Sequence, residues 1–305
     1  VAAAGCLWGS VGFFVKSLLD AQIPLSTIIV WRMLFAFIVL FFYLLWKDKS
    51  LLKIDRHLLK YVISIGLISQ CLFNICYFSA IKITTIATAV TLLYTAPIFI
   101  AILARIFYRE FFSYNKIVAL FLSIIGCFLT VTGGQWHNLQ LNFPGIMLGL
   151  GAGLTFASLT IISKPIVNRY HPFTIVFYSI GFGLMFYLPF SQPLILFQYH
   201  SGLKIWFYCL SLSLISTIFA YLFYIGGLSK GIEASKAGII STIEVVVSVI
   251  VSFLFFQERI IGWKLIGILM VISSVVSVQL KQLNAQGTIQ KSNTEIAKNK
   301  SLSNE

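Results

Sequence analysis

Charged residues are scarce in this sequence, and acidic ones are the scarcest. Only 10% of the 305 residues are charged, and Asp and Glu together number nine. Soluble globular domains are about one quarter charged, so an ordinary soluble protein is excluded. Nine dispersed acidic residues also give no Asp, His or Glu cluster for a membrane enzyme that acts on lipid-linked substrates, and we expect no catalytic residues.

Patterns that bind metals, redox centres or nucleotides are missing as well. The five cysteines lie inside apolar runs without a CxxC or Cys/His pair at ligand spacing, and the four histidines are dispersed. Neither a GxxxxGK[ST] phosphate loop nor an HExxH helix occurs. We therefore expect no metal, no cofactor and no ATP-driven pump.

Apolar residues, in contrast, make up 59% of the chain and give a mean hydropathy of +0.94. They form stretches close to the roughly 20 residues that cross a bilayer as a helix. These stretches are 2–19, 25–46, 58–80, 86–108, 114–133, 143–163, 173–191, 203–228, 237–256 and 262–280. Strands of a membrane barrel would alternate polar and apolar residues, and these runs do not. The sequence therefore predicts an all-α integral membrane protein with ten transmembrane helices.

The basic residues indicate how the chain crosses the membrane. The net charge is +13, but Lys and Arg are scattered between apolar runs, which argues against nucleic acid as a partner. Cytoplasmic loops retain Lys and Arg, and an inside N-terminus places sixteen of them there against five on the other side. We expect a multi-pass protein of the cell (inner or plasma) membrane with both termini cytoplasmic and a flexible tail over 282–305. Because Val1 lies inside the first apolar run, we also expect native residues before it.

The sequence also resembles itself at a long spacing. Matches at a shift of 147 or 148 residues are Leu7–Ser10 over Thr155–Ser158, Pro24–Ser26 over Pro172–Thr174, Leu67–Tyr77 over Leu214–Tyr224 and Glu110 over Glu258. They divide the chain into two homologous halves of five helices each, 1–133 and 149–281. Because five is odd, the second half enters the membrane upside down, which is the inverted-topology repeat of many transporters.

Two ionisable residues fall inside predicted helices, where a charge is costly and marks a functional site by default. Arg32 and Glu244 each lie about 10 Å into their helix, near the depth at which inverted-repeat transporters hold their substrates. We assign Arg32 to a substrate carboxylate or phosphate, and Glu244 to a substrate amine or a coupling proton. The structural alternative is that Arg32 binds backbone carbonyls or Glu244 itself and fixes helix packing.

The third and eighth helices carry matching polar stripes, with residues at i, i+4 and i+7 on one face. The stripes are Gln70, Asn74 and Tyr77 in the third helix and Thr217, Tyr221 and Tyr224 in the eighth. A face turned to lipid has no use for such groups, so we expect both stripes to line an aromatic, moderately polar cavity, with Tyr94 and Tyr178 as further walls. Interhelical hydrogen bonding is the alternative.

Small residues at regular spacing and charged residues at helix ends predict how the helices pack and are held together. Gly5 and Gly9, and likewise Gly145, Gly149 and Gly153, recur at every fourth position. Small side chains at this spacing let two helices approach closely. Glu110 and Glu258, at equivalent helix ends, are interpreted as interfacial anchors or loop salt bridges, because a charge at a helix end loses little hydration.

Together these residues resemble the drug/metabolite transporter superfamily, specifically its ten-helix EamA-type branch, over nearly the whole chain. The resemblance is carried by Leu7–Ser10 with Lys16, by Arg32, and by the spacings Ala87, Pro97, Glu110 and Ala234, Glu244, Glu258. It implies a secondary transporter, and Trp8, as part of the signature, joins the candidate substrate-binding residues. That family usually reads Glu-Pro in the ninth helix, whereas here Val245 follows Glu244.

The resemblance and the aromatic cavity lead to a specific expectation. We expect export of an amino acid or a related amphiphilic metabolite by alternating access, with a small-molecule substrate, the lipid bilayer as surroundings and a monomeric protein. Uptake of a sugar, a nucleotide sugar or a quaternary amine remains the alternative. A membrane enzyme for lipid-linked substrates is the alternative from another class, and a scaffold would gain nothing from two oppositely oriented halves.

Overall fold

The computed structural model describes residues 1–135, 139, 142–197, 202–257, 260 and 262–279. Its described part contains helices and turns but no strand, and nine of its helical spans are long and apolar enough to cross a membrane. A tenth apolar helix, Trp263–Gln279, follows them. The prediction of an all-α membrane protein with ten helices is therefore confirmed, whereas Glu258 and the tail over 282–305 lie outside the described residues.

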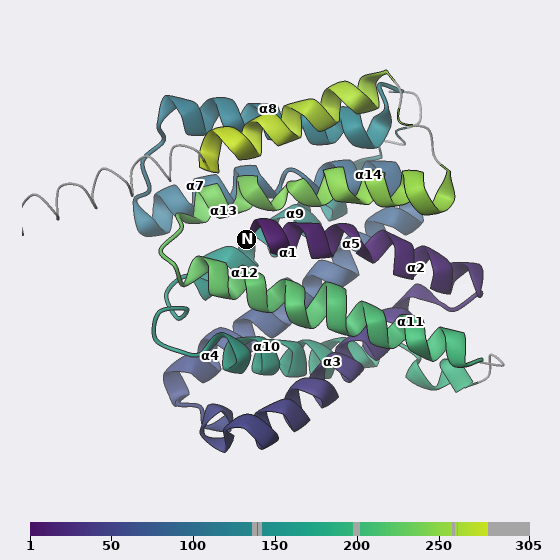
Figure 1. The fold of residues 1–305 in the computed structure, drawn as a ribbon, viewed down its shortest axis with the longest axis vertical. Helices are drawn as coiled ribbons and strands as arrows, with labels where there is room; N and C mark the ends of the chain where they lie inside the picture. The colour runs from purple at the N-terminus through teal and green to yellow at the C-terminus, as the bar shows by residue number, and fades with distance from the viewer. Residues whose placement is uncertain (136–138, 140–141, 198–201, 258–259, 261, 280–305) are drawn as a thin grey trace, which may run out of the picture.

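The elements in chain order are α1 (Ala2–Gly9) and α2 (Val11–Asp20), α3 (Leu25–Lys47), α4 (Arg56–Ser64) and α5 (Phe73–Ile83), α6 (Ile86–Leu93) and α7 (Ala96–Tyr108), α8 (Tyr114–Thr132), α9 (Phe143–Ser163), α10 (Pro172–Tyr187), α11 (Leu203–Ser213) and α12 (Ala220–Leu228), and α13 (Ala234–Ser241) and α14 (Ile243–Phe256). Paired labels belong to one membrane span. Short 3-10 helices, Lys49–Leu52 and Pro193–Phe197, lie in the loops after α3 and α10. Figure 1 shows the spans running roughly side by side, with α8 and the last helix together at one edge of the bundle.

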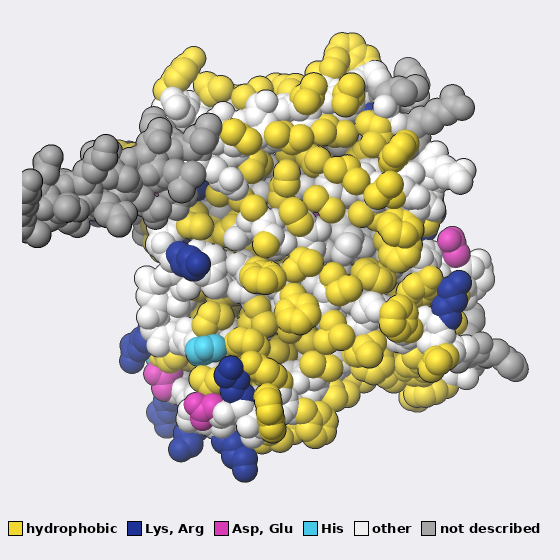
Figure 2. Space-filling view, viewed as in Figure 1, with side chains coloured by type: hydrophobic (Ala, Val, Ile, Leu, Met, Phe, Trp, Pro, Cys, Tyr) yellow, Lys and Arg dark blue, Asp and Glu magenta, His cyan; other side chains and the backbone are white. Residues whose placement is uncertain are grey.

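Apolar side chains cover the middle of the surface. Figure 2 shows them over most of the visible face, whereas Lys and Arg gather at its lower left, where α3 ends and α4 begins. Phe42, Phe121, Phe207 and Leu254 are each more than half exposed. A contiguous apolar surface of this extent would cause aggregation in water, and it fits contact with lipid.

Helix geometry is irregular at matching places in the two predicted halves. The third span contains a π-helical segment, Ile65–Leu72, and the eighth span contains another, Leu214–Phe219. The fourth span is interrupted between α6 and α7, and the ninth between α13 and α14. Single-turn π segments occur often at functional sites, so these irregular points direct attention to the centre of the bundle.

A proline accompanies only one of the two interruptions. Pro97 lies in the first turn of α7, where its missing N–H and its ring end the preceding helical hydrogen bonding. The ninth span has no proline, yet it is interrupted at Thr242, whose hydroxyl donates to Ile239 O at 2.7 Å. Ser241 Oγ likewise donates to Gly238 O. The ninth span therefore breaks without the proline that the resemblance to EamA-type transporters implies at this place.

Hydrogen bonds between helices are reciprocal across the two halves. Ser10 Oγ lies 2.9 Å from Ser216 Oγ, and Ser158 Oγ lies 2.6 Å from Ser69 Oγ. A shift of 147 or 148 residues converts one pair into the other. Reciprocal contacts of this kind are what a two-fold relation between two halves produces. The opposite orientation of the halves in the membrane stays a prediction.

Glycines allow the closest helix contacts. A Cβ built on Gly5 would lie 2.5 Å from Ile243 on α14, and one on Gly149 would lie 2.5 Å from Leu92 on α6. Gly126 and Gly267 face each other, because a Cβ on either would approach the other's carbonyl oxygen within 2.9 Å. The predicted packing role of the glycine stripes therefore has a steric basis here.

Glu110 joins three spans at the end of the bundle that the charge bias predicts to be cytoplasmic. Its carboxylate accepts hydrogen bonds from Ala234 N at 2.6 Å, Ser235 N at 3.1 Å and Ser235 Oγ at 2.6 Å. Lys164 Nζ lies 3.4 Å from the same carboxylate and donates to Ile232 O. Glu110, in the loop directly after α7, thus caps α13 and is an anchor, as its position at a helix end predicts.

Hydrogen bonding changes the acidity of this anchor. Burial alone would raise the pKa of Glu110, but the hydrogen bonds from the hydroxyl and N–H of Ser235 and the N–H of Ala234, with the charge of Lys164, lower it overall. A carboxyl whose pKa is lowered on folding stabilises the folded state at pH values above its unfolded pKa. That stability is lost as the pH falls through the lower folded value.

Replacing Glu110, whose carboxylate accepts the hydrogen bonds from Ser235, should remove this pH dependence of stability. At pH 7 we expect Glu110→Gln to lower stability by about 1–3 kcal/mol, because charge-assisted hydrogen bonds weaken. As the pH falls below about 4.3, the ordinary pKa of Glu, the unfolding temperatures of the two proteins should begin to converge, and they should meet below the lower pKa of the folded state. Tryptophan fluorescence of the purified protein between pH 7 and pH 3.5 measures this, with exposed Asp20→Asn as the control. Parallel curves for wild type and variant would contradict the assignment.

A pair of glycine substitutions tests the close helix contacts. Gly267→Ala places a methyl group 2.5 Å from Thr130 Oγ1 and 2.6 Å from Gly126 O, so we expect a loss of about 1–3 kcal/mol, typical of overpacking. Gly226→Ala on α12 meets no atom within 4 Å and should gain about 0.5–1 kcal/mol from helix propensity. Thermal unfolding in detergent measures whether each substitution lowers or raises stability. Equal effects at the two positions would exclude a steric role for Gly267.

Candidate functional site

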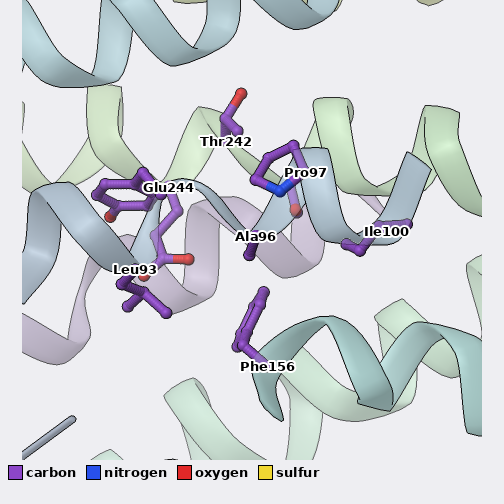
Figure 3. Close-up of a pocket in the computed structure, with 9 residues that line it drawn as sticks. Leu93, Ala96, Pro97, Ile100, Phe156, Thr242 and Glu244 are labelled. Atoms are coloured by element: carbon purple, nitrogen blue, oxygen red, sulfur yellow. The ribbon is translucent and has the colours of Figure 1, made fainter. Parts of the chain in front are cut away.

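A narrow pocket lies where the fourth and ninth spans are interrupted. Tyr94, Pro97, Phe156, Thr242 and Glu244 are among the residues that line it. Figure 3 shows the Glu244 side chain reaching toward Leu93 and Ala96, with Phe156 on the far side of the space. The cavity volume is about 20 Å³, which is room for about one water molecule. This conformation is therefore closed around a site that would have to open for a metabolite.

Glu244 lies in this pocket without an ionic or hydrogen-bonding partner among the described residues. It occupies the first turn of α14, where the positive end of the helix dipole stabilises a carboxylate. Its electrostatic neighbours are the phenols of Tyr77, Tyr94 and Tyr221 and the thiol of Cys127. The carboxylate therefore has hydrogen-bonding groups around it but no positive charge to neutralise it.

Aromatic rings form one side of the site. Trp8 is 6% exposed, and its ring lies 5.5 Å from Tyr221, 5.1 Å from Tyr224 and 5.8 Å from Phe156. Phe156 is the residue that the repeat aligns with Trp8, so two equivalent aromatic residues meet at the centre. The Tyr224 hydroxyl lies 2.5 Å from Thr160 Oγ1, which fixes that ring and makes Tyr224 a supporting residue.

The polar stripe of the third span lies in the protein interior, as predicted. Gln70 and Asn74 are each 2% exposed. Asn74 Nδ2 donates to Gln70 O, in the π-helical segment. Gln70 Nε2 has no hydrogen-bond partner of normal geometry in the described chain, although Tyr221 lies beside the side chain. Tyr77 stacks on Phe73 with ring centroids 5.7 Å apart.

Arg32 approaches the same centre from α3. Its Nε is buried and has no hydrogen-bond partner within the described ranges, and its electrostatic neighbours are Tyr221 and Tyr187. No ion pair joins Arg32 to Glu244 in the described structure. The Tyr221 phenol interacts with both Arg32 and Glu244. The two side chains of opposite charge therefore lie near the same phenol but do not form an ion pair.

Several of these side chains lie deep in the bundle and still keep accessible surface. Protein surrounds the side chains on most sides, but part of the surface of each stays accessible. They are Arg32, Tyr77, Tyr94 and Glu244. Nine of the ten predicted site residues, from six different spans, therefore lie toward the bundle interior, and two of them, Tyr94 and Glu244, line the pocket.

Tyr178 is the predicted residue that the structure does not bring to this space. Its hydroxyl donates to Leu52 O at 2.6 Å, in the short helix after α3. The sequence analysis also missed Phe156 and Tyr187. The repeat could have identified Phe156 as the partner of Trp8, whereas no spacing in the sequence marks Tyr187.

Comparisons with known proteins agree with this architecture. The model of the EamA-like transporter family matches residues 1–132 and 143–279. An uncharacterized transporter of Archaeoglobus fulgidus is 28% identical over 200 residues, which are 66% of this chain and 69% of that protein. The uncharacterized inner membrane transporter YicL of Salmonella typhimurium is 25% identical, over 92% of this chain and 94% of that one.

A solved crystal structure shares the fold with a TM-score of 0.74 at 17% identity, over 91% of this chain and 94% of that chain. The family match spans both predicted halves, and the ten-helix bundle with its closed central pocket is consistent with it. This chain belongs to the EamA-like transporter family and is a multi-pass membrane transporter.

Proposed function

We propose that this transporter exports an amino acid or a related amphiphilic metabolite across the cell membrane, by alternating access between two inverted halves and with both termini in the cytoplasm. The observation that carries the proposal is the unpaired Glu244 carboxylate, which lies half-buried beside tyrosines at the interruption of two spans. A substrate ammonium group would supply the missing positive charge.

Aromatic residues favour a substrate with an apolar part. Phe156 lines the pocket, and Trp8 packs against it. Aromatic faces bind both apolar side chains and cations. An amine attached to an apolar group would satisfy Glu244 and these rings together, and a sugar would leave the carboxylate without a counter-charge.

The closed pocket supports alternating access as the mechanism. A cavity of about 20 Å³ cannot hold an amino acid, so binding requires the surrounding helices to move. The interrupted fourth and ninth spans meet at the pocket, and inverted-repeat transporters bind substrate at such discontinuous helices near the bilayer midplane. A substrate-free, closed state fits this cycle.

Glu244→Gln tests both the substrate and the coupling. The change keeps the shape of the side chain and removes its charge, so we expect the apparent affinity for an exported amino acid to fall about 10- to 100-fold. If Glu244 also carries the coupling proton, accumulation driven by a pH gradient is lost. Proteoliposomes loaded with radiolabelled amino acids measure both quantities, with Asp20→Asn as the matched carboxylate control.

The outcomes separate the possible mechanisms. Loss of gradient-driven accumulation with retained exchange assigns the proton to Glu244. Flux that is indifferent to Glu244→Gln would instead indicate uniport or exchange without a proton at this residue. Wild-type liposomes that move no amino acid, but do move sugars or quaternary amines, would overturn the proposed substrate.

A further inference from the structure

Two buried hydrogen-bond donors near the centre of the bundle have no acceptor at normal hydrogen-bond geometry among the described residues, although the Tyr221 hydroxyl contacts the Gln70 amide. They are Arg32 Nε and Gln70 Nε2. Gln70 is 2% exposed, and both side chains lie beside Tyr221, which interacts with the Arg32 charge and adjoins the Gln70 amide. A buried donor left unpaired costs about 1–3 kcal/mol, and a charged one costs more. Two such donors at one phenol therefore indicate a missing acceptor.

The neighbouring protein groups do not fill this role. Asn74 is engaged with the Gln70 carbonyl, and Tyr187, the other neighbour of Arg32, offers a phenol and no negative charge. The described structure contains no ion pair between Arg32 and a carboxylate. A guanidinium deep in a membrane protein normally pairs with an acid or with backbone carbonyls, so an unpaired one marks a place for an anion.

We propose that Arg32 and Gln70 form an oxyanion subsite that receives a carboxylate or phosphate of the transported molecule. This inference rests on the proposed transport function and narrows it. Arg32 supplies the charge and an N–H, and the Gln70 amide supplies a second donor from another helix. The Tyr221 phenol interacts with Glu244 as well as with Arg32. The complete site therefore takes a molecule that carries both a positive and a negative group.

The positions of the donors fit a change of shape on binding. Arg32 lies on α3, Gln70 lies in the π-helical segment of the third span, and Tyr221 lies on α12. A bound anion would connect three spans from both predicted halves. The π segment is a place where helical winding can adjust, so the anion would draw Gln70 and Arg32 together as the site fills.

Binding of paired probes to the full-length purified protein tests the subsite. In the first arm, L-leucine, L-phenylalanine and L-threonine are each compared with their amides, which keep the amine and lose the carboxylate. In the second arm, phosphoethanolamine is compared with ethanolamine. The first arm reports a carboxylate and the second a phosphate. We expect at least one anionic probe to bind about 10- to 100-fold tighter than its neutral partner.

Variants connect that preference to the two donors. Arg32→Gln and Gln70→Met should reduce the preference for the anionic probe to less than about threefold, and Arg56→Gln, which removes an exposed charge from α4, should leave it unchanged. Unfolding temperatures without ligand provide a second readout. Removing an unpaired donor should leave the temperature unchanged or raise it, whereas removing a structural hydrogen bond lowers it.

Each failure has a distinct meaning. Equal binding of acids and amides by the wild type would overturn the oxyanion subsite and leave transport of amines through Glu244 intact. A lower ligand-free unfolding temperature for both Arg32→Gln and Gln70→Met would make the pair structural and overturn the subsite as well. If no probe of either arm binds, the proposed amino acid transport fails, and the subsite fails with it.

Discussion

The hydrocarbon core of a bilayer offers no water, so every polar group within it must find its partner in the protein. This constraint explains why the helices of this transporter can be irregular where the site lies. At each irregular point a side chain also donates to a carbonyl of the preceding turn, in most cases one that already accepts a backbone N–H. These bonds run from Ser10 to Leu7 O, Asn74 to Gln70 O, Thr95 to Leu92 O, Thr217 to Leu212 O and Thr242 to Ile239 O. Local polar side chains thus allow bends and breaks without exposing backbone to lipid.

The same constraint gives meaning to the groups that lack a partner. Many hydroxyls back-bond to their own helices, but those of Thr91, Ser163 and Ser179 do not. Arg32 Nε and Gln70 Nε2 are likewise without a partner in the described chain, and Glu244 forms no ion pair there. Pairing Arg32 directly with Glu244 would lower the cost of both charges. Because Arg32 and Glu244 instead lie separately beside Tyr221, the protein without ligand is less stable than it would be with an ion pair. The unpaired charges remain free to bind a ligand, as a transporter of small solutes requires.

Much of the fold follows from the sequence because lipid imposes a simple length and polarity rule. The apolar run over 86–108 corresponds to the span Ile86–Tyr108, and the run over 143–163 to α9. By the same rule, lone charges and stripes at helical spacing made Arg32, Glu244 and Gln70 candidate site residues, and their roles in binding stay predictions. Irregular geometry was harder to predict, since the ninth span breaks at Thr242 without a proline, and a hydroxyl bond like that of Thr242 also occurs at Thr130 inside the unbroken helix α8.

Side-chain direction was the least predictable feature. Tyr178 and Tyr187 lie on the same helix, α10. Tyr178 binds the Leu52 carbonyl in a loop, whereas Tyr187 adjoins Arg32. Which tyrosine faces the site depends on how α10 packs against α3 and on the course of the loop after α3, and neither is written in the local sequence of α10.

The broken spans also suggest what moves as one unit. A Cβ on Gly238 of α13 would lie 2.8 Å from Ile100 of α7, so these two half-helices are packed tightly together between the pocket and the Glu110 anchor. That anchor consists of three hydrogen bonds and one ion pair. At about 1 kcal/mol each, such bonds favour the closed end by a few kcal/mol. A difference of that size leaves an alternative conformation populated at about 0.1–10%. In the alternating-access cycle that we propose, the anchor would hold one end of the site shut and still release it.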